Sequence, residues 1–411
     1  MSPPPGGRAA FRRAQWRVLL ATSFCYLFYY TGRQNFGWAI PGIRDELGLT
    51  NTQIGWIGGT ALAFYGAGQV VSGYLGDRVG GRRMVTLGAF ASCALNWTTS
   101  FGRGFWSLLV PWALNGYAQS LGFAPGSRLI ASWWDERERG RAFGIFTFAA
   151  GFSSVLTFGT AIWVLGRFTW AWVFRLPVLL LPVGGLVFFW LAEERPVEPA
   201  ARGPAGATGP SSPAPSIREG AREVLANRRF LVTALGFGFG NWARLGLLAW
   251  VPVHFLGAGG KADPAATWIT MALPVGMALG ALAAGYAADL LFRGDHARLI
   301  AWGLVLASLA AVALLAVPRD AHPAGIGLLF LAGFFVFGPF ASFTALSAEL
   351  LGHRLMGTGI GVMNAIGYAV AAVGDPVMGM VIDATGRTAS VFLVTATVCL
   401  AGAVCGHLAR P

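Results

Sequence analysis

The stretch Gly73-Tyr74-Leu75-Gly76-Asp77-Arg78 ends a long apolar run, and Gly285-Tyr286-Ala287-Ala288-Asp289 repeats it in the second half of the chain. Upstream of each copy, a lone arginine lies inside an apolar run and a proline follows eight residues later: Pro41 follows Arg33, and Pro252 follows Arg244. From Arg33 to the aspartate of the first copy there are 44 residues, and from Arg244 to that of the second there are 45. Two landmarks in the same register indicate an internal repeat, which is common in membrane transporters.

The composition places these landmarks inside a membrane protein. The chain has 411 residues, of which 55% are hydrophobic and only 12% are charged, and its mean hydropathy is +0.59. A soluble domain has about twice that charged fraction. The 58 glycines and 22 prolines lie mainly within apolar runs, where transmembrane helices tolerate both residues. This composition excludes a cytosolic enzyme as the default interpretation.

Twelve stretches have the roughly 20 apolar residues that a bilayer-spanning helix requires. They lie at about 17–40, 53–75, 84–101, 105–128, 141–164, 170–191, 229–255, 266–291, 298–317, 324–347, 356–381 and 388–409. A tract rich in Pro, Gly, Ala and Ser separates the sixth from the seventh and predicts a linker. We therefore expect a cytoplasmic tail, a six-helix half, a cytoplasmic linker and a second six-helix half over 1–16, 17–191, 192–228 and 229–411. The expected fold class is all-α and integral to the membrane, with two pseudo-symmetric halves.

The net charge of +12 reflects arginines in particular loops. They gather before the first and seventh spans and after the second and fourth, and the opposite loops contain few. Because cytoplasmic loops carry an excess of basic residues, both termini are expected in the cytoplasm of a multi-pass protein of the cell (inner) membrane. The basic residues then need no nucleic-acid partner.

Arg33 and Arg244 differ from the other arginines because each lies near the middle of its span. Ionisable groups at this depth are costly and usually mark a pathway or a partner. If the halves are related by a two-fold axis, the two guanidinium groups face each other and attract an anion, whose oxygens suit their planar donor forks. The alternative is structural pairing of each arginine with helix-end carbonyls or with an acid, for which Asp375 in the eleventh span is the best candidate.

Polar side chains accompany the arginines. Tyr26, Tyr30 and Arg33 are spaced four and three residues apart, which places them on one helical face. Two further pairs are spaced by four residues, Tyr65 with Gln69 and Asn364 with Tyr368. Tyrosines in mid-span on the arginine face favour a cavity over an interface anchor.

The stretch from Gly73 to Arg83 resembles the cytoplasmic signature of the major facilitator superfamily. That resemblance implies the two-half fold and a gating role for a set of residues at the ends of the second and eighth spans: Asp77, Arg78, Arg82, Arg83 and Asp289. It says almost nothing about the substrate.

More specific motifs resemble the organophosphate:phosphate antiporters, which include bacterial glycerol-3-phosphate and hexose-6-phosphate transporters. They are Tyr29-Tyr30-Thr31-Gly32-Arg33-Gln34-Asn35-Phe36, the fourth-span residues from Asn115 to Arg128 with the following Trp133-Trp134, and Asp289-Leu290-Leu291-Phe292-Arg293-Gly294-Asp295. The resemblance implies that Arg33 and Arg244 hold a phosphate. It implies a surrounding substrate site of Tyr26, Tyr30, Tyr65, Gln69, Asn241 and Tyr368.

The sequence also departs from that family. A fifth-helix histidine of the glycerol-phosphate transporter corresponds to Ala150, and a second-helix lysine corresponds to Gln69. A tyrosine before the second arginine is replaced by Asn241, and an acid after it by Ala249. These changes point to a phosphorylated or other anionic metabolite different from glycerol-3-phosphate.

The function expected is secondary active transport of a small organic anion by alternating access, in exchange for inorganic phosphate. One alternative is a proton-coupled carboxylate or drug carrier that uses Asp375, and another is a non-transporting membrane sensor of a sugar phosphate. We expect no enzymatic activity, no cofactor and no metal site. The expected partners are the anion, inorganic phosphate and the lipid bilayer around a monomer.

Overall fold

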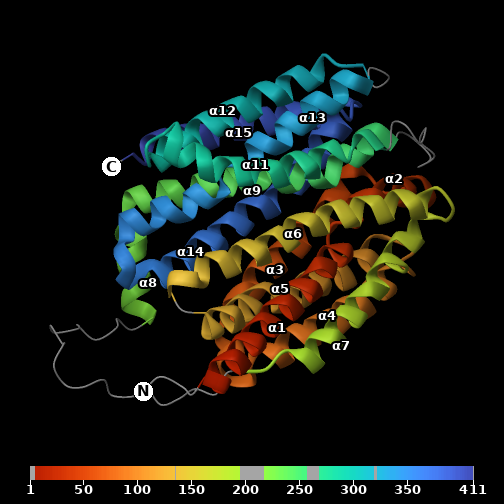
Figure 1. Cartoon of the computed structure of the whole chain (residues 1–411). Coiled ribbons are helices and arrows are strands. Elements are labelled where there is room, and N and C mark those ends of the chain that lie inside the picture. The colour runs from red at the N-terminus through yellow and green to blue at the C-terminus, as the bar shows by residue number, and fades with distance from the viewer. Residues whose placement is uncertain (1–4, 135, 195–216, 257–267, 319–321, 411) are drawn as a thin grey trace.

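The computed structural model describes residues 5–134, 136–194, 217–256, 268–318 and 322–410, and every regular element in these ranges is a helix. Figure 1 shows two helical bundles side by side, the first half of the chain in red to yellow and the second in green to blue. The all-helical fold in two halves, expected from the repeat, is therefore confirmed.

In the described part of the first half there are ten helical segments, and some predicted spans consist of more than one of them. They are α1 (Pro5–Tyr29), η1 (Tyr30–Gly32), α2 (Phe36–Leu47), α3 (Asn51–Val79), α4 (Gly81–Thr99), α5 (Phe105–Trp133), α6 (Glu136–Leu165), η2 (Trp170–Phe174), η3 (Pro177–Leu179) and α7 (Leu180–Leu191). The second half consists of α8 (Ile217–Ala226), α9 (Arg228–Leu256), α11 (Ala272–Leu290), α12 (His296–Leu315), α13 (His322–Phe337), α14 (Phe340–Thr385) and α15 (Ser390–Leu408).

Several predicted boundaries differ from the observed ones. The first predicted span, 17–40, is interrupted after Tyr29 and continues as α2 from Phe36. The tenth, 324–347, is split between α13 and the start of α14, where Gly338 and Pro339 intervene. The long α14 bends at Gly352, whose φ of 68° lies in the left-handed region that glycine adopts most readily. Within the predicted linker, residues 195–216 lie outside the described ranges.

Helix α8 occupies the end of that predicted linker and has one buried and one exposed face. Val224 is fully buried and Leu225 is exposed. Just after the helix, the Asn227 side chain donates a hydrogen bond to the Leu350 carbonyl at 3.1 Å. This contact fixes the entry into α9 against α14.

The outer surface of the bundles carries large apolar side chains. Trp106, Trp190, Leu290 and Leu309 are between 60% and 77% exposed. A soluble monomer rarely exposes so many, whereas a membrane protein turns them towards lipid. By length and composition, seven helical stretches of the described chain can cross a membrane: Arg141–Leu165, Trp170–Leu191, Ala272–Leu290, His296–Leu315, His322–Gly352, Leu355–Thr385 and Ser390–Leu408. The stretch with Arg33 is outside this set because its helix is interrupted there, and α9, with Arg244, is also outside it.

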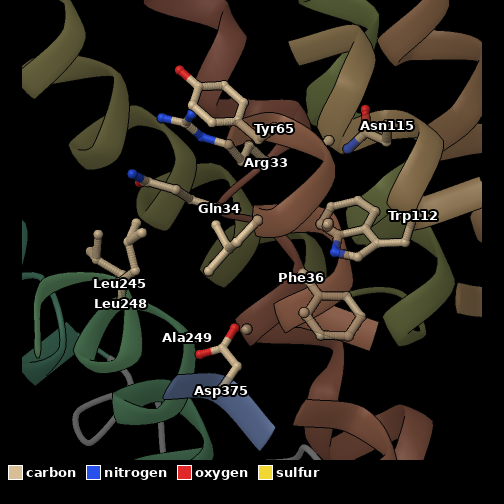
Figure 2. A pocket seen from close by; sticks show the side chains of 15 residues that line it. Arg33, Gln34, Phe36, Tyr65, Trp112, Asn115, Leu245, Leu248, Ala249 and Asp375 are labelled. Atoms are coloured by element: carbon tan, nitrogen blue, oxygen red, sulfur yellow. The ribbon is translucent and has the colours of Figure 1, made fainter. Parts of the chain in front are cut away.

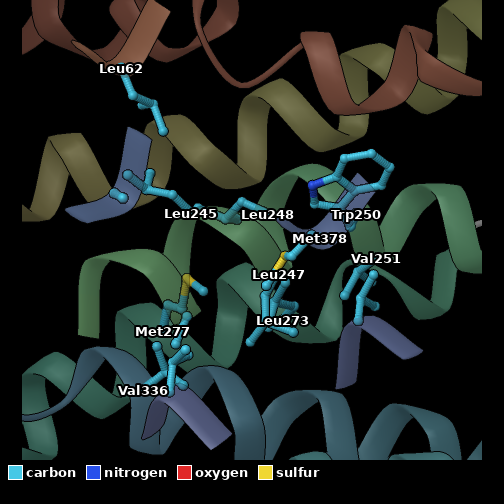
Figure 3. Close-up of a cluster of buried hydrophobic side chains, with 14 of the residues drawn as sticks. Leu62, Leu245, Leu247, Leu248, Trp250, Val251, Leu273, Met277, Val336 and Met378 are labelled. Atoms are coloured by element: carbon cyan, nitrogen blue, oxygen red, sulfur yellow. The ribbon is translucent and has the colours of Figure 1, made fainter. Parts of the chain in front are cut away.

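One hydrophobic core continues from the first half into the second. Figure 3 shows Leu62 of α3 extending towards Leu245 and Leu248 of α9, with Trp250 and Met378 farther along the same cluster. The junction lies towards the ends of the bundles where α2 ends and α3 begins, and we call this the Asn51 end. The opposite end, with the N-terminus and α8, is called the linker end (Figure 1).

Candidate functional site

Arg33 lies in a break between two helices. Helix α1 ends at Tyr29, a 3₁₀ turn follows over Tyr30–Gly32, and Arg33 has φ −128° and ψ −42°. The backbone amides of Arg33 and Gln34 both donate to the Tyr30 carbonyl, at 3.0 and 2.8 Å. A membrane-embedded break is tolerated only when its freed carbonyls find other partners or face a cavity.

The break is held by a polar network from α4 and α5. The Gly32 carbonyl accepts hydrogen bonds from the side-chain amides of Asn96, at 3.0 Å, and Asn115, at 2.7 Å. Ser92 donates to the Asn115 side-chain oxygen at 2.7 Å, and Gln119 donates to Ser92 at 2.7 Å. All four side chains are buried. These residues position Arg33 without being part of the predicted site, and the four-residue spacings Ser92/Asn96 and Asn115/Gln119 were the sequence signal for them.

The Arg33 guanidinium lies among tyrosine rings from both halves. Its central carbon is 4.4 Å from the ring centre of Tyr30 and 4.6 Å from that of Tyr65. The Tyr65 ring in turn meets the Tyr368 ring of α14 edge to face, with centres 4.7 Å apart. Tyr26 contacts Tyr30 but packs mainly against Tyr29 and Phe146, inside the first half. The structure thus brings Tyr30, Tyr65 and Tyr368 around the arginine and leaves Tyr26 behind them.

Arg244 lies near the middle of α9 and is 8% exposed. Its guanidinium carbon is 4.9 Å from the ring centre of Phe337 and 5.3 Å from that of Phe340. Tyr30 and Tyr368 are each close enough to interact electrostatically with both Arg244 and Arg33. The two arginines predicted from the repeat therefore lie within electrostatic range of the same two tyrosines.

Several buried polar atoms near the arginines have no hydrogen-bond partner within the described chain. They are Arg33 Nε, Gln34 Oε1, Gln69 Nε2 and both amide atoms of Asn241. Asn241 precedes Arg244 by almost one helical turn and is only 1% exposed. Buried polar groups are normally satisfied, so a cluster of unsatisfied ones indicates a place where a polar ligand binds. Gln34 was absent from the predicted site, and its position next to Arg33 was the only sequence signal.

A cavity of about 60 Å³ adjoins this cluster. Figure 2 shows Arg33 and Tyr65 at one end of it and Asp375 at the other. Phe36 and Trp112 line one side, and Leu245 and Leu248 of α9 line the opposite side. Gly37 presses against Ala249 here, since a Cβ on Gly37 would lie 2.6 Å from the Ala249 carbonyl oxygen. That contact with the Ala249 backbone explains why position 37 is a glycine.

Asp375 pairs with neither arginine. Within the described residues it forms no ion pair, although it is only 7% exposed. The pairing alternative considered for Arg33 and Arg244 therefore has no support in this geometry. Ala150, another position at which the sequence departs from the family pattern, is buried in the core of the first half.

The two halves are fastened together at the Asn51 end by Asp383 of α14. One carboxylate oxygen accepts from the backbone and side-chain amides of Asn51, at 3.1 and 2.7 Å. The other accepts from the backbone amide and hydroxyl of Thr52, at 2.8 and 2.6 Å. A carboxylate at a helix N-terminus is stabilised by the free amides and the helix dipole. We call these four hydrogen bonds the Asp383 clasp. The sequence did not reveal the clasp, because the partners are more than 330 residues apart.

The predicted gating residues lie at the linker end. The side chains of Asp77 and Arg78 fall outside the described residues. Arg82 lies 4.2 Å from the ring centre of Phe189, and its backbone amide donates to Glu194 at 2.7 Å. Arg83 and Asp289 are exposed. The structure does not bring these described side chains together, so their gating role stays a prediction.

The chain is similar to known proteins over most of its length. The sequence matches the Major Facilitator Superfamily over residues 22–374. It is 24% identical to the glycerol-3-phosphate transporter of Bacillus subtilis (strain 168), covering 91% of this chain and 88% of that protein. It is 26% identical to the membrane sensor protein UhpC of Salmonella typhimurium, covering 88% and 84%.

The fold also matches a crystal structure of a bacterial homolog of the human lysosomal transporter Spinster in an inward-facing and unoccupied conformation. The TM-score is 0.75 at 17% identity, and the match covers 97% of this chain and 95% of that one. The arrangement of the two halves is thus shared with a solved structure over almost its full length.

Proposed function

The chain belongs to the Major Facilitator Superfamily, and from that membership we propose that it is a secondary transporter of a phosphorylated or other small organic anion. The observation that carries the proposal is that Arg33 and Arg244, one from each half, both lie within electrostatic range of Tyr30 and Tyr368. Neither arginine has an acidic partner among the described residues. The relatives named above include a glycerol-3-phosphate transporter, which supports a phosphorylated substrate.

The arginine pair favours a doubly charged anion. Two guanidinium groups in a region of low dielectric repel each other, and a bound dianion replaces that repulsion with two charge-assisted hydrogen-bonded contacts. Gln34, Gln69 and Asn241 supply further unpartnered polar atoms for the rest of the substrate. Tyr30, Tyr65 and Tyr368 provide ring faces and hydroxyl groups around it. Tyr26, the remaining member of the proposed site, supports Tyr30 from within the first half.

Alternating access follows from contacts concentrated at one end. At the Asn51 end, the Asp383 clasp and the continuous core join the halves, so the structure corresponds to the state closed on that side. Rocking of the halves about the midplane then opens the Asn51 end and exposes the site on that side. The empty cationic site returns less readily than a site that holds inorganic phosphate. The proposed cycle is therefore an exchange of the organic anion for phosphate.

The arrangement in the membrane is also a proposal. The arginines that flank the first, second, fourth and seventh spans favour a cytoplasmic linker end. The Asn51 end then faces outward, and Asp77, Arg78, Arg82, Arg83 and Asp289 belong to the inner gate. The six-helix halves over 17–191 and 229–411, joined by the segment 192–228, act as the two rocking bodies of a monomer.

Counterflow of labelled phosphate in proteoliposomes tests the proposal. We expect exchange in the parent protein and its loss in Arg33→Ala and in Arg244→Ala. Arg167→Ala is the matched control, because Arg167 is exposed in the turn after α6 and its side chain contacts the carbonyl and the ring of nearby Trp163. Exchange that continues unchanged in either site variant contradicts the assignment.

One relative favours a second candidate function. UhpC is named as a membrane sensor, and its sequence covers most of this chain. A sensor would bind a sugar phosphate through the same arginines without moving it. Binding by purified protein, measured by thermal shift and lost in Arg33→Ala, combined with absence of counterflow in the parent, would select the sensor.

A further inference from the structure

Asp375 is a buried acid to which the anion site assigns no role. It belongs to α14 in the second half, and its side chain points towards α3 in the first. A Cβ on Gly58 would lie only 2.6 Å from its Oδ2 atom, so the carboxyl group rests directly on the α3 backbone. Gly55, one turn earlier in α3, makes room for the Asp375 backbone in the same way. The carboxyl group therefore lies at the interface between α3 and α14, which forms when the Asn51 end closes.

No positive charge offsets this carboxyl group within the described chain. Arg33 lines the same cavity but lies between the rings of Tyr30 and Tyr65 and forms no ion pair with Asp375. From α9, the Trp250 indole N–H lies beside the carboxyl group without reaching the geometry of a hydrogen bond.

The other titratable groups on the surrounding elements have different neighbours. His254, one turn beyond Trp250, is hydrogen-bonded to Thr388 at 3.0 Å. Asp383, two turns farther along α14, is occupied by the start of α3. Tyr65, the titratable residue of α3 at the cavity, faces Arg33, and α2 contributes only Phe36 and Gly37 to the lining.

The cost of this arrangement depends on conformation. An ionised carboxylate that is removed from water without a partner costs several kcal/mol, whereas a neutral carboxylic acid costs much less. When α3 and α14 separate at the Asn51 end, water reaches the carboxyl group and the ionised form is again stable. The closed and open states must therefore differ in their affinity for a proton at this site.

We propose that Asp375 is a proton-binding site whose occupancy controls closure of the Asn51 end. Closure takes one proton from the water on that side and forms an O–H bond on the carboxylate. Opening breaks that bond and returns the proton to water. The inference rests on the proposed alternating-access function, because it requires the Asn51 end to open.

The inference is tested by the distance between spin labels on the two halves, in a background without the four native cysteines. Arg103 and Arg387 are suitable label positions because both are exposed and lie in loops at the Asn51 end. In the parent, lowering the pH should shift the labels towards the short distance. The ratio of closed to open should change by at most about tenfold per pH unit, as one titrating group allows.

Asp375→Asn carries an amide of the same shape and should be closed at every pH, so its pH response is lost. Asp383→Asn is the matched control on the same helix. It should weaken closure but retain the pH response, because its hydrogen bonds do not require a proton to bind. A parent without a pH response, or an Asp375→Asn variant that retains the parental response, overturns the inference.

Phosphate counterflow separates this inference from the proposed function. If counterflow is lost in Arg33→Ala while Asp375→Asn keeps the parental pH response of the labels, the transporter stands and the proton site falls. If the label response behaves as expected but the parent binds no phosphate, the proton site stands and the anion function falls. A further probe is 2-aminoethyl phosphate, which carries an ammonium group. If Asp375→Asn loses binding of this compound but retains the pH response of the labels, Asp375 is a ligand for the ammonium group, and the inference is overturned.

Discussion

Arg33 and Arg244 occupy matching positions in the two halves but are held there by different chemistry. Arg33 follows a helix break whose Gly32 carbonyl is bound by Asn96 and Asn115. Arg244 lies inside the unbroken helix α9 and contacts two phenylalanine rings that pack against each other. The repeat therefore preserves where each guanidinium lies, whereas the means of support differs between the halves. One arginine is positioned by buried hydrogen bonds and the other by packing.

The largest expected effect is the loss of either guanidinium. Replacing Arg33 or Arg244 by alanine leaves the remaining charge without a second partner for the dianion. Truncating one member of a buried charge pair costs about 2–5 kcal/mol, which corresponds to a loss of affinity of about 30-fold or more. Phosphate affinity measured by titration calorimetry checks this. Equal losses of phosphate affinity in the two variants would show that each arginine contributes equally to binding, however it is held in place. A loss of affinity confined to one variant would contradict this equivalence of the two halves.

The next effect distinguishes two buried asparagines, one in each half. Asn115→Leu removes three hydrogen bonds and leaves the Gly32 carbonyl with one fewer donor, so the free energy of unfolding should fall by about 1–3 kcal/mol. Asn241→Leu removes a side chain that has no partner in the described chain, so stability should hold or rise. Both variants should weaken phosphate binding. Thermal unfolding with and without phosphate measures the two quantities together.

The contrast would be lost if Asn241→Leu destabilised the ligand-free protein as strongly as Asn115→Leu. That result would mean that Asn241 has a structural partner. A stable Asn241→Leu variant that still bound phosphate normally would instead remove Asn241 from the site.

A smaller effect is expected from the aromatic rings around the arginines. A cation–π contact contributes about 0.5–2 kcal/mol, depending on its exposure to water. Tyr65→Phe keeps the ring face near Arg33 and should change phosphate affinity by less than Tyr65→Leu, which removes it. Phe340→Tyr would give Arg244 a hydroxylated neighbour like those of Arg33, while Phe340→Leu would remove its ring. If the hydroxyl matters more than the ring, Tyr65→Phe and Tyr65→Leu will be equally impaired.

The smallest expected effect concerns the starts of α4 and α12, which correspond in the repeat. Glu194 from a distant segment accepts from the Arg82 amide at the start of α4, whereas the local Asp295 caps α12 by accepting from the Arg298 amide at 2.8 Å. Partial burial of Asp295 opposes ionisation, but the hydrogen bonds from Arg298 and Arg410 outweigh it and keep the pKa of Asp295 below its usual value.

A carboxyl group with a lowered pKa stabilises the fold at neutral pH, and this stabilisation is lost as the pH falls through the folded-state pKa. Asp295→Asn should therefore lower the melting temperature slightly at pH 7, and the difference from the parent should disappear in acid. A constant difference between pH 3 and pH 7 would show that the carboxylate charge contributes nothing there.

The sequence predicted the features that depend on local pattern. Apolar runs of about 20 residues marked the spans, and the repeat of Arg33 in Arg244 marked the centre of the site. Depth along a helix can be counted directly from the sequence, so both arginines were located without knowledge of any contact. Tyr65 and Tyr368 were marked by polar pairs spaced by four residues, and their place in the predicted site came from the family resemblance.

Other features were hidden because they depend on contacts between distant segments. The break before Arg33 requires Asn96 and Asn115, and nothing within residues 17–40 alone distinguishes it from a continuous helix. Asp383 is a polar residue near the end of a span, where acids are ordinary. Only the meeting of α14 with α3 gives it a function. The position of Asp375 on Gly58 was hidden for the same reason, since spacing does not reveal which helices touch.

The Asp383 clasp has a consequence for the first turn of α3. The same carboxylate that joins the halves also satisfies the Asn51 and Thr52 backbone amides, so opening leaves these donors without it. Each opening event should then release the first turn of α3 as well as separate the halves. Slow amide hydrogen exchange at residues 51 and 52 would record how often the Asn51 end opens, without a label or a substrate.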